Sequence, residues 1–93
     1  MMGDTVKFDE IECSPDVAEK LWRKHGVGLD EVAEALGYEP HVRRGPDGLC
    51  YVLGRTEVGR YLFVVVRPVS PGIGLIVTAR DMTVAERRSY HRR

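Results

Sequence analysis

The hydrophobic period of the chain changes near Tyr38, and this change constrains the fold more than any other feature. Before Tyr38, apolar residues recur at spacings of three and four, as in amphipathic helices. After it, short apolar segments are separated by turns rich in glycine and proline. The length of 93 residues suits one domain with one core. We therefore expect a single α+β domain over residues 1–93, with two N-terminal helices packed on an antiparallel meander of three to four strands and a short C-terminal helix.

Two short helices are predicted in the first half of the chain. Ser14 is a suitable N-cap and a proline follows it, so the first helix should run from Pro15 to His25. The segment from Leu29 to Leu36 repeats apolar residues at i, i+3, i+4 and i+7, which predicts the second helix. The earlier segment from Val6 to Ile11 fits either a short strand or an extended arm.

The second half should form consecutive antiparallel strands and end in a helix. Turn sequences such as Gly45-Pro46-Asp47-Gly48 separate the apolar segments. Thr83 and Glu86 form a capping box, which predicts the start of the C-terminal helix. The strand candidates are His41–Arg44, Leu49–Arg55, Arg60–Arg67 and Ile73–Arg80. The predicted core joins Val17, Leu21, Trp22, Val32 and Leu36 of the helices to Leu62, Val64, Val66, Leu75 and Val77 of the strands. Because Tyr61 to Val66 is apolar on both faces, a shift of the strand faces by one residue is the alternative.

Charge is sorted along the sequence although the net charge is +0. Residues 1–40 contain ten acidic and four basic side chains, whereas residues 41–93 contain four acidic and ten basic ones, all of them arginine. Arginine suits bidentate contacts with phosphate and carboxylate groups. The sorting predicts a positive face for a polyanion or an acidic protein, with a solvated charged surface as the alternative.

The sequence lacks the usual signs of a metal centre, a disulfide scaffold or a membrane protein. Cys13 and Cys50 lie far apart with no CxxC spacing, and no dinucleotide fingerprint is complete. The longest apolar stretch, Tyr61 to Val66, is too short to span a bilayer, and the N-terminus does not resemble a signal peptide. We expect a cytoplasmic protein without a metal or cofactor that does not enter membranes.

Three groups of residues occur in an order that is informative as a set. The first is Arg23-Lys24-His25-Gly26-Val27 leading into Leu29-Asp30-Glu31-Val32, the second is Leu53-Gly54-Arg55 with Gly59-Arg60, and the third runs from Ile76-Val77-Thr78-Ala79-Arg80 through Thr83 and Glu86-Arg87-Arg88 to Tyr90. Over nearly the whole chain, this set resembles the BrnT family of toxins from bacterial type II toxin–antitoxin systems.

The resemblance implies a fold like that of RelE, a ribonuclease scaffold of helices packed on an antiparallel sheet. It also implies RNA cleavage that arrests growth. The implied protein partner is a BrnA-type antitoxin that neutralises the toxin. A heterotetramer with the antitoxin, or a homo-oligomer, is the expected assembly.

Metal-free RNA cleavage defines the chemical groups to look for. A base removes the proton of the ribose 2′-OH, cations stabilise the charged phosphorane, and an acid protonates the leaving 5′ oxygen. Arg80 is the leading phosphate clamp because strand alternation places it opposite the apolar Ala79 face. Arg55 is the second catalytic candidate, and His25 is the third because histidine exchanges protons near neutral pH. The candidate substrate-binding residues are Arg60, Lys24, Tyr90, Arg87 and Arg88.

Alternatives to this active site remain open. Arg55 and Arg60 flank one turn, where they would either share an anion or lie solvated. The sequence also departs from the BrnT pattern, since residues 47–50 contain no arginine and Gly28 replaces the usual serine cap. The alternative function is a catalytically inactive BrnT-like module that binds an antitoxin or nucleic acid. The structural alternatives are pairing of Arg80 with Glu86 or Asp81, capping of a helix end by His25, and packing of Tyr90 on the sheet.

Overall fold

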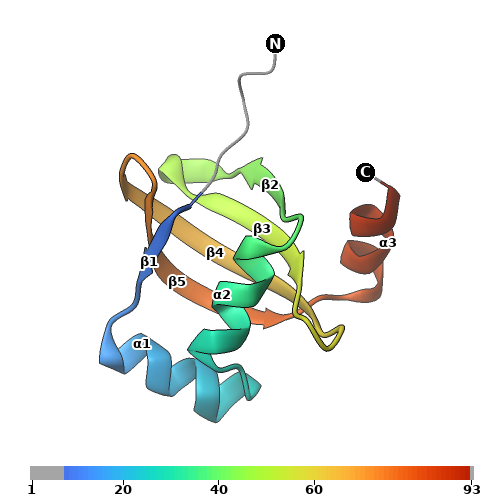
Figure 1. Ribbon diagram of the computed structural model, residues 1–93, viewed down its shortest axis with the longest axis horizontal. Coiled ribbons are helices and arrows are strands. Elements are labelled where there is room, and N and C mark those ends of the chain that lie inside the picture. Colours follow the sequence, from blue (N-terminus) through green and yellow to red (C-terminus); the bar gives the residue numbers. More distant parts are fainter. Residues whose placement is uncertain (1–7, 93) are drawn as a thin grey trace.

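The structure of the chain is a computed structural model that describes residues 8–92. In chain order its elements are β1 (Glu10–Glu12), α1 (Pro15–Lys20), η1 (Leu21–His25), α2 (Leu29–Gly37), β2 (His41–Arg44), η2 (Pro46–Gly48), β3 (Cys50–Arg55), β4 (Tyr61–Ser70), β5 (Ile73–Asp81) and α3 (Val84–Arg92). The strands form one five-stranded sheet in the order β1-β5-β4-β3-β2. Figure 1 shows α2 crossing one face of this sheet and α3 beyond the end of β5. No helix among the described residues is long and apolar enough to cross a membrane.

The α+β class agrees with the prediction, but the sheet is mixed and has one strand more than expected. Strands β2 to β5 form the predicted antiparallel meander. β1 adds a fifth strand that runs parallel to β5, because Glu10–Glu12 pair with Ile73–Leu75. A strand of three residues is too short to show an alternating pattern in the sequence. Within the segment Val6–Ile11, the first two residues lie outside the described part of the chain and the last two belong to β1.

The two N-terminal helices begin and end close to their predicted positions. Ser14 caps α1, since its hydroxyl oxygen accepts a hydrogen bond from the Val17 amide at 3.2 Å. The helix continues through η1, a π-helical turn that reaches His25. α2 lies so close to β3 that a Cβ atom at Gly54 would be 2.2 Å from the Ala35 carbonyl oxygen. Only glycine permits this approach, which seats α2 directly on the sheet.

The main core lies between the helices and the sheet, and two of the predicted core residues are exposed instead. Trp22 is 66% exposed and Val77 is 39% exposed. Trp22 lies in the π-helical turn, whose wider spacing shifts it away from the apolar stripe of α1. The buried members of the core are Leu21, Val27, Val32, Ala35, Leu36, Val52, Leu62, Val64, Val66, Ile76 and Ala79.

A β-bulge in β5 explains the exposure of Val77. The pairing between β4 and β5 skips Val77, so the side-chain alternation changes by one residue at this point. Ile76 and Ala79 therefore both face the helices, and Leu75 lies on the other side of the sheet, contrary to the prediction. Arg80 still lies opposite Ala79, as expected.

The second face of the sheet carries a smaller apolar cluster beneath α3. The predicted capping box starts this helix, because the Thr83 amide donates to Glu86 Oε1 at 2.8 Å and the Glu86 amide donates to Thr83 Oγ1 at 3.1 Å. Since strand residues alternate between faces, α3 packs opposite to α1 and α2. The buried residues of this cluster are Leu53, Met82 and Tyr90, with Tyr61 and Phe63 packed against them.

Candidate functional site

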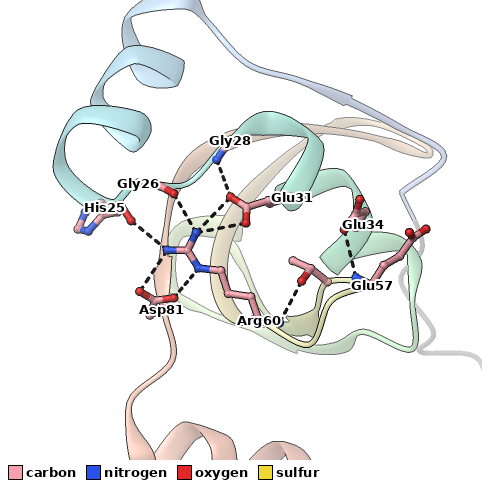
Figure 2. A network of polar contacts seen from close by, with 9 residues as sticks. His25, Gly26, Gly28, Glu31, Glu34, Glu57, Arg60 and Asp81 are labelled. Atoms are coloured by element: carbon pink, nitrogen blue, oxygen red, sulfur yellow. Dashed lines mark hydrogen bonds and ion pairs between the residues drawn. The ribbon is translucent and has the colours of Figure 1, made fainter.

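Arg60 joins three elements of the fold, and Figure 2 shows its contacts. Its Nε and Nη2 atoms donate hydrogen bonds to the Asp81 carboxylate at 2.8 and 3.2 Å, and Nη1 donates to Glu31 Oε1 at 3.1 Å. The guanidinium also donates to the main-chain oxygens of Gly26 at 2.8 Å and His25 at 3.0 Å. These bonds give every N–H group of the guanidinium an acceptor. The Arg60 side chain is 25% exposed, so the network is only partly open to water.

In this arrangement the Arg60 guanidinium is engaged by groups of the protein itself. Hydrogen bonds from Arg60 lower the pKa of Asp81, and the charge of His25 adds a smaller effect in the same direction. The bond to Asp81 is in turn the main cause that raises the pKa of Arg60. Glu31 also accepts a hydrogen bond from the Gly28 amide at 3.0 Å, where α2 begins. A phosphate would have to displace two carboxylates to reach Arg60.

Arg55 and Arg60 flank the turn between β3 and β4, and their side chains point in different directions. Thr56 is 1% exposed and accepts a hydrogen bond from the Arg60 amide at 3.0 Å. Glu34 of α2 accepts a hydrogen bond from the Glu57 amide at 3.1 Å, which ties the turn to the helix layer (Figure 2). Arg60 turns toward α2, whereas Arg55 lies on the sheet face that carries α3. The anions beside Arg60 are carboxylates of the protein itself.

Arg55 lies at a polar pocket beside the C-terminal helix. Its Nη2 atom donates a hydrogen bond to the Tyr38 hydroxyl at 3.5 Å, and its guanidinium lies 5.3 Å from the centre of the Tyr38 ring. Hydrogen bonds to the phenols of Tyr61 and Tyr38 raise the pKa of Arg55. Within residues 8–92, Arg55 makes no ion pair with a carboxylate. The pocket has a volume of about 290 Å³ and is lined by Glu39, Arg55, Tyr90 and His91.

A second arginine and a histidine of α3 lie against Tyr61, the residue paired with Arg55 across the sheet. The Arg87 guanidinium lies 4.4 Å from the centre of the Tyr61 ring, and the His91 ring lies 5.3 Å from it. The Tyr90 ring is buried 6.0 Å from the Tyr61 ring. We call Tyr38, Arg55, Tyr61, Arg87 and His91 the Arg55–His91 cluster.

Two local features of the fold build this cluster. The register of β3 and β4 places Arg55 opposite Tyr61. Arg87 and His91 are four residues apart in α3, so they lie on the same side of that helix. Tyr90 anchors the helix, because its ring is buried and its hydroxyl donates to the Glu39 main-chain oxygen at 3.3 Å. The structure therefore agrees with the alternative that the sequence left open for Tyr90, which was packing on the sheet.

Arg80, the leading phosphate clamp of the sequence analysis, is paired within the protein. Its Nη1 and Nη2 atoms donate to the two carboxylate oxygens of Glu86 at 2.8 and 2.9 Å. The guanidinium also lies 4.2 Å from the centre of the Phe63 ring. The hydrogen bonds from Arg80 are the main cause that lowers the pKa of Glu86. The pairing with Glu86 is the structural alternative that the sequence left open.

The other predicted site residues lie apart from the Arg55–His91 cluster. His25 and Lys24 are exposed at the end of η1 and line a pocket of about 310 Å³ next to Thr78 of β5. No hydrogen bond, ion pair or ring contact in the described part of the chain joins His25 to Arg55. Arg88 is exposed on α3. The structure thus brings together Arg55, Arg87 and Tyr90 from the predicted set.

Sequence reasoning missed three members of the cluster, namely Tyr38, Tyr61 and His91. The sequence carried one signal for His91: it lies four residues after Arg87 in a predicted helix, so the two side chains share one side of that helix. Tyr61 could not be assigned in this way, because its position beside Arg55 depends on the strand register.

The cluster offers the groups that metal-free RNA cleavage uses. Two guanidinium groups suit phosphate oxygens, an imidazole suits proton transfer, and phenol rings suit stacking on bases or proton donation. Among the described residues, no group of three or more histidine, cysteine, aspartate or glutamate side chains is arranged to hold a metal ion.

The comparisons with known proteins place the fold. No protein-family model matches the chain, and no curated protein sequence matches it significantly. Among solved structures, the chain is similar to the Brucella abortus ribonuclease toxin BrnT, with a TM-score of 0.68 and 16% sequence identity. The alignment covers 85% of this chain and 99% of that chain. The chain therefore has a BrnT-like fold, which agrees with the resemblance found in its sequence.

Proposed function

We propose that this protein is a metal-independent endoribonuclease of the toxin type, which arrests growth by cleaving RNA and is neutralised by a small antitoxin protein. The observation that carries the proposal is the Arg55–His91 cluster, in which Arg87 and His91 lie against the Tyr61 ring and Arg55 and His91 line one pocket. The similarity of the fold to that of a ribonuclease toxin supports the same conclusion.

Arg55 is proposed to hold the phosphate that is cleaved. Its positive charge is not neutralised by a carboxylate within residues 8–92, and the hydroxyl of Tyr38 orients its guanidinium. A guanidinium held in this way stabilises the extra negative charge of the phosphorane without reorganising first. Arg87, stacked on Tyr61, supplies a second positive charge nearby.

His91 is proposed to move the protons. The 2′ oxygen attacks phosphorus, the bond from phosphorus to the 5′ oxygen breaks, and a 2′,3′-cyclic phosphate remains. His91 either removes the proton from the 2′-OH or returns a proton to the departing 5′ oxygen, with a phenol of Tyr38 or Tyr61 available for the opposite role.

The earlier assignments of Arg80 and His25 become competing proposals. Arg80 would bind phosphate only after releasing Glu86, whereas its present contacts hold α3 on the sheet. His25 would act from the side of the molecule where its main-chain oxygen accepts a hydrogen bond from Arg60.

A non-catalytic binding module is the second candidate function. The pairing of Arg60 and Arg80 with carboxylates favours it, because neither arginine is prepared to receive a phosphate. Such a module would bind an antitoxin or nucleic acid through the same surface without cleaving RNA.

The two candidates are separated by inducing the protein in a bacterium and following growth together with RNA integrity. The matched control is the double variant Arg55→Ala, His91→Ala, tested at equal protein level and with its melting temperature measured. We expect the parent to arrest growth and fragment RNA, and the double variant to do neither. The purified parent should also cleave RNA in the presence of EDTA. Intact RNA and normal growth with the parent would favour the binding module.

A further inference from the structure

We infer that a second pocket on the same sheet face binds one nucleobase of single-stranded RNA. The pocket, here called the Tyr51 pocket, has a volume of about 380 Å³. That its ligand is RNA rests on the proposed function. The pocket would recognise one base of the RNA, in addition to the site where the RNA is cleaved. The lining residues that matter are Tyr51, Leu53 and Phe63 of the sheet, Ala85 and Ser89 of α3, and Arg43 of β2.

The Tyr51 pocket and the Arg55–His91 cluster lie on opposite sides of α3. Tyr51 and Arg55 share one face of β3 because they are four residues apart in a regularly paired strand. At the rise of a strand, this spacing is about 13 Å. Leu53, between them in the strand, is buried with Tyr90 beneath the helix. Because α3 covers the sheet between the two sites, a single strand of RNA that occupies both would cross over this helix.

The Tyr51 ring is fixed in place as a stacking surface. A Cβ atom at Gly45 would lie 2.9 Å from the Tyr51 Cζ atom, so the ring rests on backbone that only glycine leaves open. The Phe63 ring lies 5.5 Å from the Tyr51 ring with an angle of 55° between the planes. The Arg80 guanidinium lies 4.2 Å from the centre of the Phe63 ring, and both aromatic rings line the pocket. A ring held on two sides loses little freedom when a base stacks on it.

The chemistry of the pocket matches a flat heteroaromatic ring. Leu53 and Ala85 provide an apolar floor beside the aromatic side chains. Arg43 Nη2 donates a hydrogen bond to Ser89 Oγ at 3.1 Å, so a donor and a hydroxyl stand at the rim for the polar edge of a base. An aliphatic ligand would make no use of the polar rim, and a phosphate would not use the apolar floor.

The test measures binding of a single-stranded RNA hexanucleotide with 2′-O-methyl riboses, which lacks the nucleophile and is not cleaved. Tyr51→Leu keeps an apolar side chain but removes the ring, and Tyr51→Phe keeps the ring. Trp22→Leu is the matched control, because Trp22 is an exposed aromatic residue near the end of the first helix. We expect about a tenfold loss of affinity for Tyr51→Leu, the size of one lost base stack. Tyr51→Phe and Trp22→Leu should bind like the parent.

Equal affinities of the parent and Tyr51→Leu would overturn the inference, as would a parent that binds no hexanucleotide. A second measurement uses the parent alone: nucleoside 5′-monophosphates should shift the NMR signals of Gly45, Tyr51 and Phe63, whereas ribose 5-phosphate should not. If the parent cleaves RNA but Tyr51→Leu binds the hexanucleotide normally, the Tyr51 pocket does not bind a base and the proposed function is unaffected. If Tyr51→Leu loses affinity but the parent cleaves no RNA, the function fails and the pocket stands.

Discussion

Arg55 and Arg60 flank the same turn, yet the protein uses them in opposite ways. Arg60 has an acceptor for every N–H group and joins the start of α2 to the end of β5. Arg55 contacts phenol groups and, within residues 8–92, no carboxylate. The difference arises because Glu31 and Asp81 lie on the side toward which Arg60 turns.

The comparison shows that an arginine-rich half of a sequence is not uniformly a binding surface. At least one acidic residue of the first half lies among the arginines of the second half, because Glu31 forms an ion pair with Arg60. Arg80 is likewise neutralised by Glu86, within the same half. The arginines left without carboxylate partners in the described part of the chain, such as Arg55 and Arg87, are the ones that we assign to RNA.

The largest effect is expected from the histidines on the two sides of the molecule. His91→Ala should reduce RNA cleavage by about a hundredfold or more, because a lost general acid or base typically costs that much. His25→Ala should cleave RNA at nearly the parental rate and shift only the melting temperature. The cleavage rates of both purified variants on the same RNA show which histidine takes part in cleavage. Loss of cleavage in His25→Ala but not in His91→Ala would move the active site to the η1 side.

The next largest effect concerns stability. Arg60→Ala should lower the free energy of unfolding by about 2 kcal/mol, because it leaves two carboxylates and two main-chain oxygens without their donor. For a domain of this size, this corresponds to a fall of about 8–16 °C in the melting temperature. Arg67→Ala is the control, since Arg67 is exposed on β4 and its loss should stay within about 0.5 kcal/mol. Equal melting temperatures for the two variants would contradict the structural role of Arg60.

A smaller loss of stability is expected from Arg80→Ala. Glu86 would lose a bidentate partner but keep the Thr83 amide, and the pair is partly exposed, so we expect about 1 kcal/mol. Cleavage should fall less than in Arg55→Ala, because Arg80 acts through the position of α3. Chemical denaturation and cleavage assays on the same samples measure both. A cleavage loss as large as that of Arg55→Ala with unchanged stability would restore Arg80 as the phosphate clamp.

The smallest effect is a pH dependence of stability. Hydrogen bonds from Arg60 and Arg80 lower the pKa values of Asp81 and Glu86 below their unfolded values of about 3.9 and about 4.3. This stabilisation is therefore fully present above the unfolded values and is lost as the pH falls through the lower folded values. The melting temperature should change little between about pH 7 and 5 and fall below about pH 4. In the variant Asp81→Asn, Glu86→Gln, the acid decrease should be shallower, and an unchanged slope would contradict this origin.

Much of the fold was predictable because it follows from local patterns. The N-cap at Ser14, the capping box of Thr83 and Glu86, and the apolar repeat of α2 each involve neighbouring residues. The parallel strand β1 was not predictable in the same way, because its pairing joins residues far apart in the sequence. The bulge at Val77 escaped prediction because an uninterrupted apolar segment carries no signal for a skipped pair.

The site was predictable in its residue types more than in its geometry. Arginine and tyrosine at positions 55, 87 and 90 were candidates, and the structure brings these three together at one side of α3. The burial of Tyr90 and the pairing of Arg80 with Glu86 were open alternatives that only packing decides. His91 was missed because its relevance comes from the tyrosine rings that the strand register places beside it.

The most direct test of the account compares Arg55→Ala with Arg67→Ala for RNA cleavage and for melting temperature. Both changes remove one positive charge from the sheet, so non-specific electrostatic effects on RNA binding should be similar. We expect Arg55→Ala to lose about a hundredfold in cleavage rate, the usual cost of one preorganised donor, while its melting temperature stays close to the parental value. Arg67→Ala should keep nearly full cleavage. Equal cleavage by the two variants would contradict the claim that the arginine without a carboxylate partner is the one that serves the substrate.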